Sequence, residues 1–149
     1  MASPLKDQIT ADMKTAMRAG DSDRLTVIRM IKAAIQRREV DDRVELDDGG
    51  VISIVQKLVK QGQDSASQFT QGGRQELADK ELAEIDIIKQ YLPEPLSDKD
   101  LDALIDAAIT ESSATSVKDM GKVMAIVREK AQGRADMGAV SSRVKSRLT

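Results

Sequence analysis

The chain of 149 residues contains no cysteine, no histidine and no tryptophan. Without cysteine it forms no disulfide and has no thiolate nucleophile, which is typical of proteins kept in a reducing compartment. Without histidine it lacks the commonest general base and the commonest transition-metal ligand of proteins. We therefore expect no metal site and no bound cofactor.

Aromatic residues are nearly absent as well, because Phe69 and Tyr91 are the only two. The core must be built from Leu, Ile, Val, Met and Ala, which suits packed helices better than a β-sandwich. No segment is long enough to span a bilayer, and the N-terminus shows no apolar run behind a basic start. The sequence predicts an all-α protein in the cytoplasm, without a membrane partner.

Apolar residues recur with helical spacing through most of the chain. Ser3 and Pro4 favour a helix start, and Gly20 favours its end. The polar residues 41–50 interrupt the pattern and predict a loop. Four helices are expected over about 4–19, 23–40, 51–71 and 74–92, and three more follow caps at Ser97, Ser116 and Asp136. For the cap at Ser116, Asp119 is expected to complete a variant capping box.

Two prolines, Pro93 and Pro95, mark the best domain boundary in the chain, because neither continues a helix. We expect a four-helix N-terminal unit over residues 1–92 and a three-helix C-terminal unit over residues 96–149. A unit of that second size is near the lower limit for independent folding. Its helices must therefore pack tightly or dock on the first unit.

Glycines inside two predicted helices have alternative explanations. Gly62 lies within the apolar stripe of the third helix, where it permits a close helix approach or marks a bend. Gly121 lies in the first turn of the sixth helix, where another backbone, from RNA or from the seventh helix, could approach it closely. Helix packing is the favoured explanation for Gly121.

Charge is sorted along the C-terminal part of the sequence. From residue 118 onward there are eight Lys and Arg against three acidic residues, whereas residues 94–117 have one Lys and six acidic residues. Such sorting suggests an anionic partner such as RNA, although a solvated helix face explains it as well. The candidate contacts are Lys118, Gly121, Lys122, Arg128, Lys130, Gly133, Arg134, Arg143 and Lys145, with Arg29 and Lys32 as a secondary basic face. Without aromatics in this segment, phosphate contact is the expected mode, not base stacking. The first turn of the last helix could offer further N–H groups to a phosphate.

Four segments together resemble the YqeY (GatB/YqeY-like) family. They are Gly73–Glu84, Tyr91–Pro93, Asp119–Met124 and Gly133–Asp136, and Arg29 with Lys32 fits the same pattern. The resemblance covers nearly the whole chain. One position departs from the family pattern, since Gly62 stands where a basic residue is usual.

The resemblance implies that the C-terminal unit is similar to the tail domain of the B subunit of the glutamine-dependent tRNA amidotransferase. That tail contacts the body of the tRNA. It implies an accessory tRNA-binding protein, with tRNA or a tRNA-containing complex as partner and with an amidotransferase or aminoacyl-tRNA synthetase as a further candidate. Such proteins are often assigned carbon–nitrogen ligase activity with glutamine as amido donor, by analogy with that enzyme.

Catalysis by the chain alone is not indicated by its motifs. It has neither a P-loop nor a Gly-x-Ser-x-Gly nucleophile elbow. The carboxylates of Glu81 and Glu84 could act as an acid–base pair or hold a cation, but two side chains three residues apart are a weak signal. Glu81 lies between Leu77 and Ile85 and would need a cationic partner, for which Arg74 or Arg29 is a candidate. The alternative to RNA binding is a protein-interaction module, whose expected mark is an exposed apolar patch on the N-terminal unit.

Overall fold

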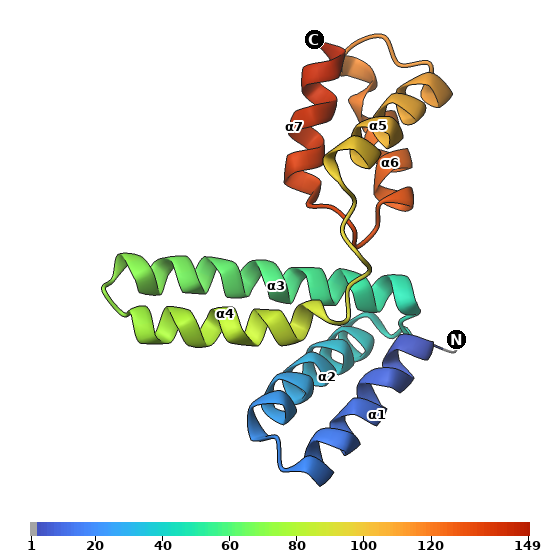
Figure 1. Cartoon of the computed structure of the whole chain (residues 1–149). Coiled ribbons are helices and arrows are strands. Elements are labelled where there is room, and N and C mark those ends of the chain that lie inside the picture. Colours follow the sequence, from blue (N-terminus) through green and yellow to red (C-terminus); the bar gives the residue numbers. More distant parts are fainter. Residues whose placement is uncertain (1–2) are drawn as a thin grey trace. The chain divides into compact units, whose positions relative to one another are not determined.

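A computed structural model describes residues 3–149 of the chain. Within these residues it contains seven α-helices, one short 3₁₀ turn and no strand (Figure 1). The predicted all-α fold class is confirmed. The helices are α1 (Pro4–Ala19), α2 (Ser22–Asp42), α3 (Asp48–Gln71), α4 (Gln75–Lys89), α5 (Asp98–Ser112), α6 (Met120–Lys130) and α7 (Met137–Leu148), with the 3₁₀ turn η1 at Val117–Asp119.

The chain divides into two compact units, Met1–Leu92 and Pro93–Thr149. Helices α1–α4 belong to the first unit, and η1 with α5–α7 belongs to the second. Each unit has its own cluster of buried aliphatic side chains, and no residue is shared between the two clusters. Each unit is therefore expected to fold around its own core.

The core of the first unit lies where α2 and α3 meet α1 and α4. Ile28, Ile31, Val51 and Val55 are completely buried there. Helices α3 and α4 run side by side as a long hairpin (Figure 1). At Gly62 of α3, a Cβ atom would lie only 2.8 Å from Cγ1 of Ile85 in α4. Of the two explanations of this glycine, close helix approach is the correct one.

Polar contacts fasten α1 to the segment around α3. Ser3 caps α1 by accepting a hydrogen bond from the Lys6 N–H, while its own hydroxyl donates to Asp48. The Leu5 N–H donates to the same carboxylate at 3.1 Å. Lys6 also forms an ion pair with Glu39 at 2.8 Å, and Glu39 accepts a hydrogen bond from the Leu46 N–H at 2.8 Å. Glu39 therefore joins α1, α2 and the loop before α3.

These contacts of Glu39 predict a loss of stability in acid. Its pKa lies below the usual value, first because Lys6 donates a hydrogen bond to it and then because the Leu46 N–H does. A carboxylate with a lowered pKa stabilises the fold above its unfolded pKa, and this stabilisation disappears as the pH falls through the folded pKa. We expect Glu39→Gln to be less stable than wild type at neutral pH and to match it in acid. Urea unfolding across that range would test this, and a constant difference at every pH would contradict it.

Tyr91 fixes the end of α4 to α1. Its side chain is only 4% exposed, and its hydroxyl donates a hydrogen bond to Oδ2 of Asp12 at 2.6 Å. Burial and this hydrogen bond both raise the pKa of Tyr91. Since the ring is buried, it is not available for stacking against a base.

In the second unit, α6 packs against both α5 and α7. Its inward side chains Val123 and Val127 are completely buried, together with Ile105 of α5 and Val144 of α7. Because one side of α6 faces this core, its opposite side is left to solvent. The second unit therefore presents the outer side of α6 as a continuous helical surface.

The structure corrects three predicted boundaries. The expected loop at 41–50 is much shorter, because Asp47 accepts a hydrogen bond from the Gly50 N–H and starts α3 early, at Asp48. Helix α4 ends at Lys89, before the predicted Leu92. At the sixth helix the expected cap at Ser116 is wrong. Ser116 makes no capping side-chain bond, and Asp119 accepts from the Thr115 N–H at 3.0 Å instead.

Candidate nucleic-acid interface

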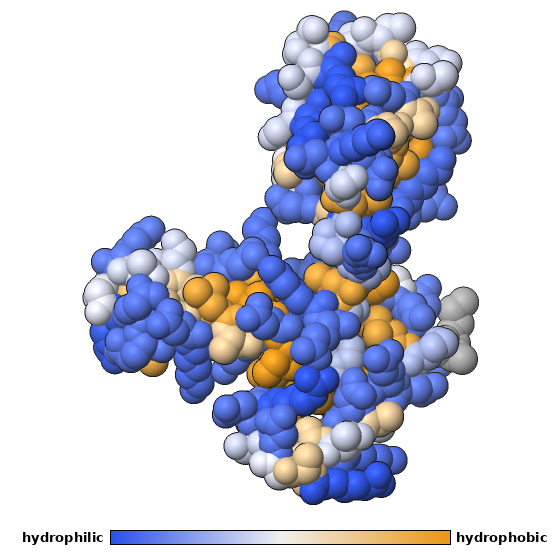
Figure 2. All heavy atoms as spheres, viewed as in Figure 1, coloured by the Kyte–Doolittle hydropathy of each residue, from blue (hydrophilic) through white to orange (hydrophobic). Residues whose placement is uncertain are grey.

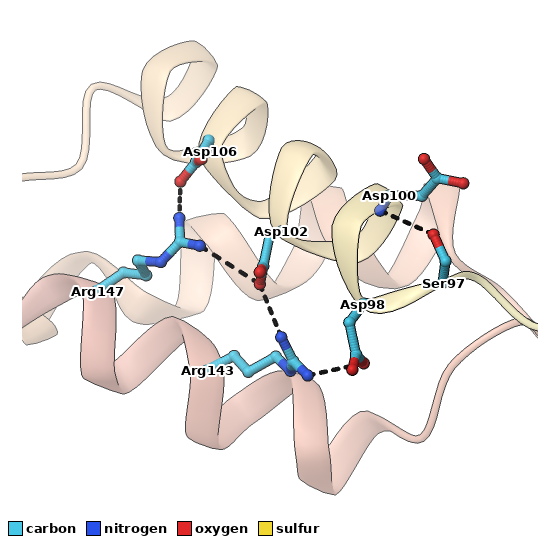
Figure 3. A network of polar contacts seen from close by, with 7 residues as sticks. All are labelled: Ser97, Asp98, Asp100, Asp102, Asp106, Arg143 and Arg147. Atoms are coloured by element: carbon cyan, nitrogen blue, oxygen red, sulfur yellow. Dashed lines mark hydrogen bonds and ion pairs between the residues drawn. The ribbon is translucent and has the colours of Figure 1, made fainter.

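Two arginines of α7 form ion pairs with three aspartates of α5 (Figure 3). Arg143 lies 2.8 Å from Asp98 and 2.8 Å from Asp102. Arg147 lies 3.3 Å from Asp102 and also pairs with Asp106. Asp102 thus joins both arginines. We call this set of five side chains the α5–α7 ladder.

The α5–α7 ladder follows from the spacing of its residues. The three aspartates are four residues apart along α5, and the two arginines are four residues apart along α7, so each group lies along one edge of its helix. Residues 93–149 contain nine acidic and nine basic residues. The acidic and basic halves of this sequence therefore neutralise each other in part by folding against each other. The expectation of a positive surface over all of α6 and α7 does not hold at Arg143.

Gly133 and Arg134 form the joint between α6 and α7. Gly133 is buried with a φ of 75°, a conformation that favours glycine. The guanidinium Nε of half-buried Arg134 donates to the Glu94 carbonyl at 2.8 Å, and the Arg134 carbonyl accepts from the Leu96 N–H at 2.8 Å. The two hydrogen bonds of Arg134 thus hold the segment before α5 against the joint, and Gly133 provides the backbone conformation of the turn.

The first turn of α7 already has its anion. The carboxylate of Asp136 accepts a hydrogen bond from the Ala139 N–H at 3.2 Å and so caps the helix. A phosphate at this position would meet a negative charge in place of free N–H groups. The expectation that this helix start contacts phosphate is therefore not supported.

The outer side of α6 and η1 carries cations that stay unpaired. Lys118, Lys122 and Arg128 are exposed, and within residues 3–149 none of the three forms a hydrogen bond or an ion pair. The pKa of nearby Asp119 is lowered, first by the Thr115 N–H and also by the charge of Lys122. We call Lys118, Gly121, Lys122 and Arg128 the open α6 face.

Gly121 lies in the open α6 face with empty space around it. A Cβ atom at this position would have no neighbour within 4 Å. The prediction that Gly121 serves helix packing is therefore wrong. Its missing side chain instead leaves the backbone of α6 uncovered between Lys118 and Lys122.

The remaining C-terminal cations differ in their surroundings. Lys130 forms an ion pair with Glu111 at 3.4 Å, in which both side chains are exposed. Lys145 is exposed and lies on the edge of α7 away from Arg143 and Arg147, because successive helical residues are about 100° apart. Lys145 remains a candidate contact, whereas the charge of Lys130 is already paired with the carboxylate of Glu111.

The secondary basic face lies on α2, in the first unit. Arg29 is exposed, and half-buried Lys32 donates a hydrogen bond to the Thr10 hydroxyl at 2.7 Å. Lys32 also lines an open cavity of about 240 Å³ between α1 and α2, beside the Lys6–Glu39 ion pair. These two cations therefore belong to a different unit from the open α6 face.

Glu81 and Glu84 lie on α4 and are not paired with the cations proposed as partners of Glu81. Both are half-buried, and neither forms an ion pair within residues 3–149, because Arg74 pairs with Glu76 at 3.0 Å instead. Burial raises the pKa of Glu84, and the charges of Glu81 and Asp23 add to this effect. Neither glutamate lines either of the two cavities found. In the described part of the chain no group of three or more acidic side chains is placed to hold a metal ion.

A family model described as "Yqey-like protein" matches residues 6–148. The chain belongs to the YqeY family. The resemblance inferred from the four sequence segments is therefore confirmed. The match runs through both units.

Several fungal proteins named "Altered inheritance of mitochondria protein 41, mitochondrial" are similar to the chain. The one from Pyrenophora tritici-repentis is 29% identical over 140 residues, which are 92% of this chain and 77% of that protein. The one from Lachancea thermotolerans is 36% identical over 103 residues, 67% of this chain and 55% of that protein. The one from Saccharomyces cerevisiae (strain YJM789) is 32% identical over 117 residues, which are 74% of this chain and 63% of that protein. In the last two cases the match spans less than two thirds of the relative.

These relatives correct the predicted location. Their names place them in mitochondria, so the expectation of a cytoplasmic protein is wrong by this comparison. A lack of cysteine indicates only a reducing environment and does not separate one such compartment from another. Among residues 3–149, no helix has the length and apolar character needed to cross a bilayer.

Proposed function

We propose that the protein is an accessory RNA-binding protein that holds the sugar–phosphate backbone of tRNA on the open α6 face. The observation that carries this proposal is the set of three exposed cations, Lys118, Lys122 and Arg128, whose side chains form no hydrogen bond or ion pair within residues 3–149. Lys and Arg contribute to nucleic-acid affinity through phosphates, without reading the sequence. The choice of tRNA rests on the family resemblance of the sequence alone, which implies that the second unit is similar to the amidotransferase B-subunit tail.

The composition of the second unit supports backbone contact over base recognition. Residues 93–149 contain no Phe, Tyr or Trp, so no ring is present to stack against an unpaired base. Gly121 leaves the α6 backbone open between two lysines, so that a phosphate strand can approach the helix closely. The proposal assigns no catalytic step to the chain and leaves any amide transfer to a partner such as an amidotransferase.

Reversing the charge of the open α6 face should abolish RNA binding. In the variant Lys118→Glu/Lys122→Glu/Arg128→Glu three phosphate contacts become repulsive, so the affinity for tRNA in a mobility-shift titration should fall at least tenfold. The matched control is Lys57→Glu/Lys60→Glu/Lys89→Glu, which applies the same charge change to exposed lysines of the first unit. Equal weakening by both variants would mean that only net charge matters, and it would remove the assignment to α6.

The alternative function is a protein-interaction module without RNA affinity. Figure 2 shows apolar residues over α3 and α4 on one face of the first unit. On this hairpin Leu82 is 47% exposed, and Phe69 and Leu77 are half-buried outside the core cluster. Pull-down from a lysate treated with ribonuclease separates the two functions. Partners that are lost with the RNA support RNA binding, whereas partners that are kept and depend on Leu82 support the alternative.

A further inference from the structure

The α5–α7 ladder has the chemistry of an anion-binding surface that is already occupied. Two guanidinium groups, one helical turn apart, face three carboxylates that are also one turn apart (Figure 3). The guanidinium group binds carboxylate and phosphate with the same planar set of donors. The arginines of α7 are thus suited to phosphates, and aspartates take that place in the resting protein.

The aspartates also repeat regularly, as phosphates do along a strand. Residues four apart in an α-helix are separated by about 6 Å along the axis. Asp98, Asp102 and Asp106 therefore form an evenly spaced row of negative charge on one edge of α5. This row resembles a stretch of nucleic-acid backbone in the regular spacing of its negative charges.

The ladder is accessible to solvent. The side chains of Arg143 and Arg147 are 35% and 36% exposed, and that of Asp98 is 87% exposed. Ion pairs at this exposure contribute little to stability and are screened by salt. The core cluster of the second unit consists of apolar side chains and includes none of the five ladder residues. Separating the arginines from the aspartates is therefore compatible with a folded second unit.

We propose that the α5–α7 ladder is a second polyanion-binding surface, kept closed by its own aspartates and opened when an RNA backbone replaces them on Arg143 and Arg147. The identity of the anion rests on the proposed function. In the closed state only the open α6 face is available, which limits the affinity of the protein for RNA. In the open state α7 adds its two arginines to the contact.

The test compares two variants with the same change in charge. Asp98→Asn/Asp102→Asn removes both carboxylates that hold Arg143, and one of the two that hold Arg147. The control, Glu94→Gln/Asp100→Asn, removes two carboxylates of the same region that form no ion pair within residues 3–149. Circular dichroism and thermal melting establish that both variants are folded. The probe is a short RNA duplex, titrated at several salt concentrations.

We expect the ladder variant to bind the duplex several-fold more tightly than the control. The slope of log affinity against log salt should also become steeper by about 0.7–0.9 for each arginine that gains a phosphate. Equal affinities and equal slopes for the two folded variants would overturn the proposal.

The same experiment separates the ladder from the open α6 face. If wild type and control bind the duplex and the ladder variant binds no better, the ladder proposal fails and the α6 assignment stands. If the ladder variant alone binds, the ladder proposal stands and the α6 assignment fails. If no variant binds, both fail.

Discussion

Gly62→Leu is expected to lower the thermal midpoint of the first unit by about 10 °C. A Cβ at residue 62 would lie 2.8 Å from Cγ1 and 3.0 Å from Cδ1 of Ile85. Ile85 is only 3% exposed, so its side chain is enclosed by its neighbours. Overpacking of this kind typically costs roughly 1–3 kcal/mol, and replacing a helical glycine recovers at most about 1 kcal/mol. Steric conflict therefore outweighs the gain in helix propensity.

Tyrosine fluorescence measures this change selectively. The chain has one tyrosine and no tryptophan, and Tyr91 lies in the first unit. The control is Gly121→Leu, the same substitution at a position in α6 where an added Cβ would have no tertiary neighbour within 4 Å. That variant should leave the Tyr91 transition unchanged. A Gly62→Leu protein with a wild-type Tyr91 transition would mean that α3 and α4 are not in close contact at this point.

Ile105→Ala is expected to unfold most of the second unit. Ile105 is completely buried in the cluster that joins α5, α6 and α7. Removing its side chain costs about 2–5 kcal/mol, because a cavity remains. A core of this size rarely contributes more than about 3–5 kcal/mol of net stability. The loss therefore approaches the whole stability of the unit.

The two units give different signals for Ile105→Ala. Circular dichroism should lose the helical contribution of α5–α7, while the Tyr91 fluorescence transition of the first unit should stay unchanged. Ile105→Val is the control, because it costs only about 0.5–1.5 kcal/mol. A variant in which both signals shift together would show that the two cores unfold as one, contrary to the separate clusters described above.

Helix positions were largely predictable because the apolar spacing is regular. The predicted first helix, over residues 4–19, matches α1, since Ser3, Pro4 and Gly20 all agree with one boundary. The loop at 41–50 is predicted too long because its residues are polar and interrupt the apolar spacing. The cap at Asp47 outweighs that effect by satisfying the Gly50 N–H. The 3₁₀ turn at η1 was missed because Asp119 bonds backward to Thr115 in place of completing a capping box.

The candidate site was predictable in its residues but not in their pairing. In the sequence, Asp102 lies in the acidic segment 94–117 and Arg143 in the basic segment that follows it. The charge count does not show that folding brings Nη1 of Arg143 to 2.8 Å from Oδ1 of Asp102. The signal was present, because aspartates at 98, 102 and 106 lie along one helix edge and arginines at 143 and 147 along another. Gly121 could not be assigned from sequence, since the space around it depends on how α7 packs.

The proposed RNA contact consists of three cations of the open α6 face on the tRNA backbone. The most direct test is the affinity of the wild-type protein for a tRNA transcript, measured between about 50 and 200 mM salt. With the α5–α7 ladder closed, three phosphate contacts predict a straight line of log affinity against log salt, with a slope of about −2 to −3. A slope near zero, or no binding at the lowest salt, would contradict the account.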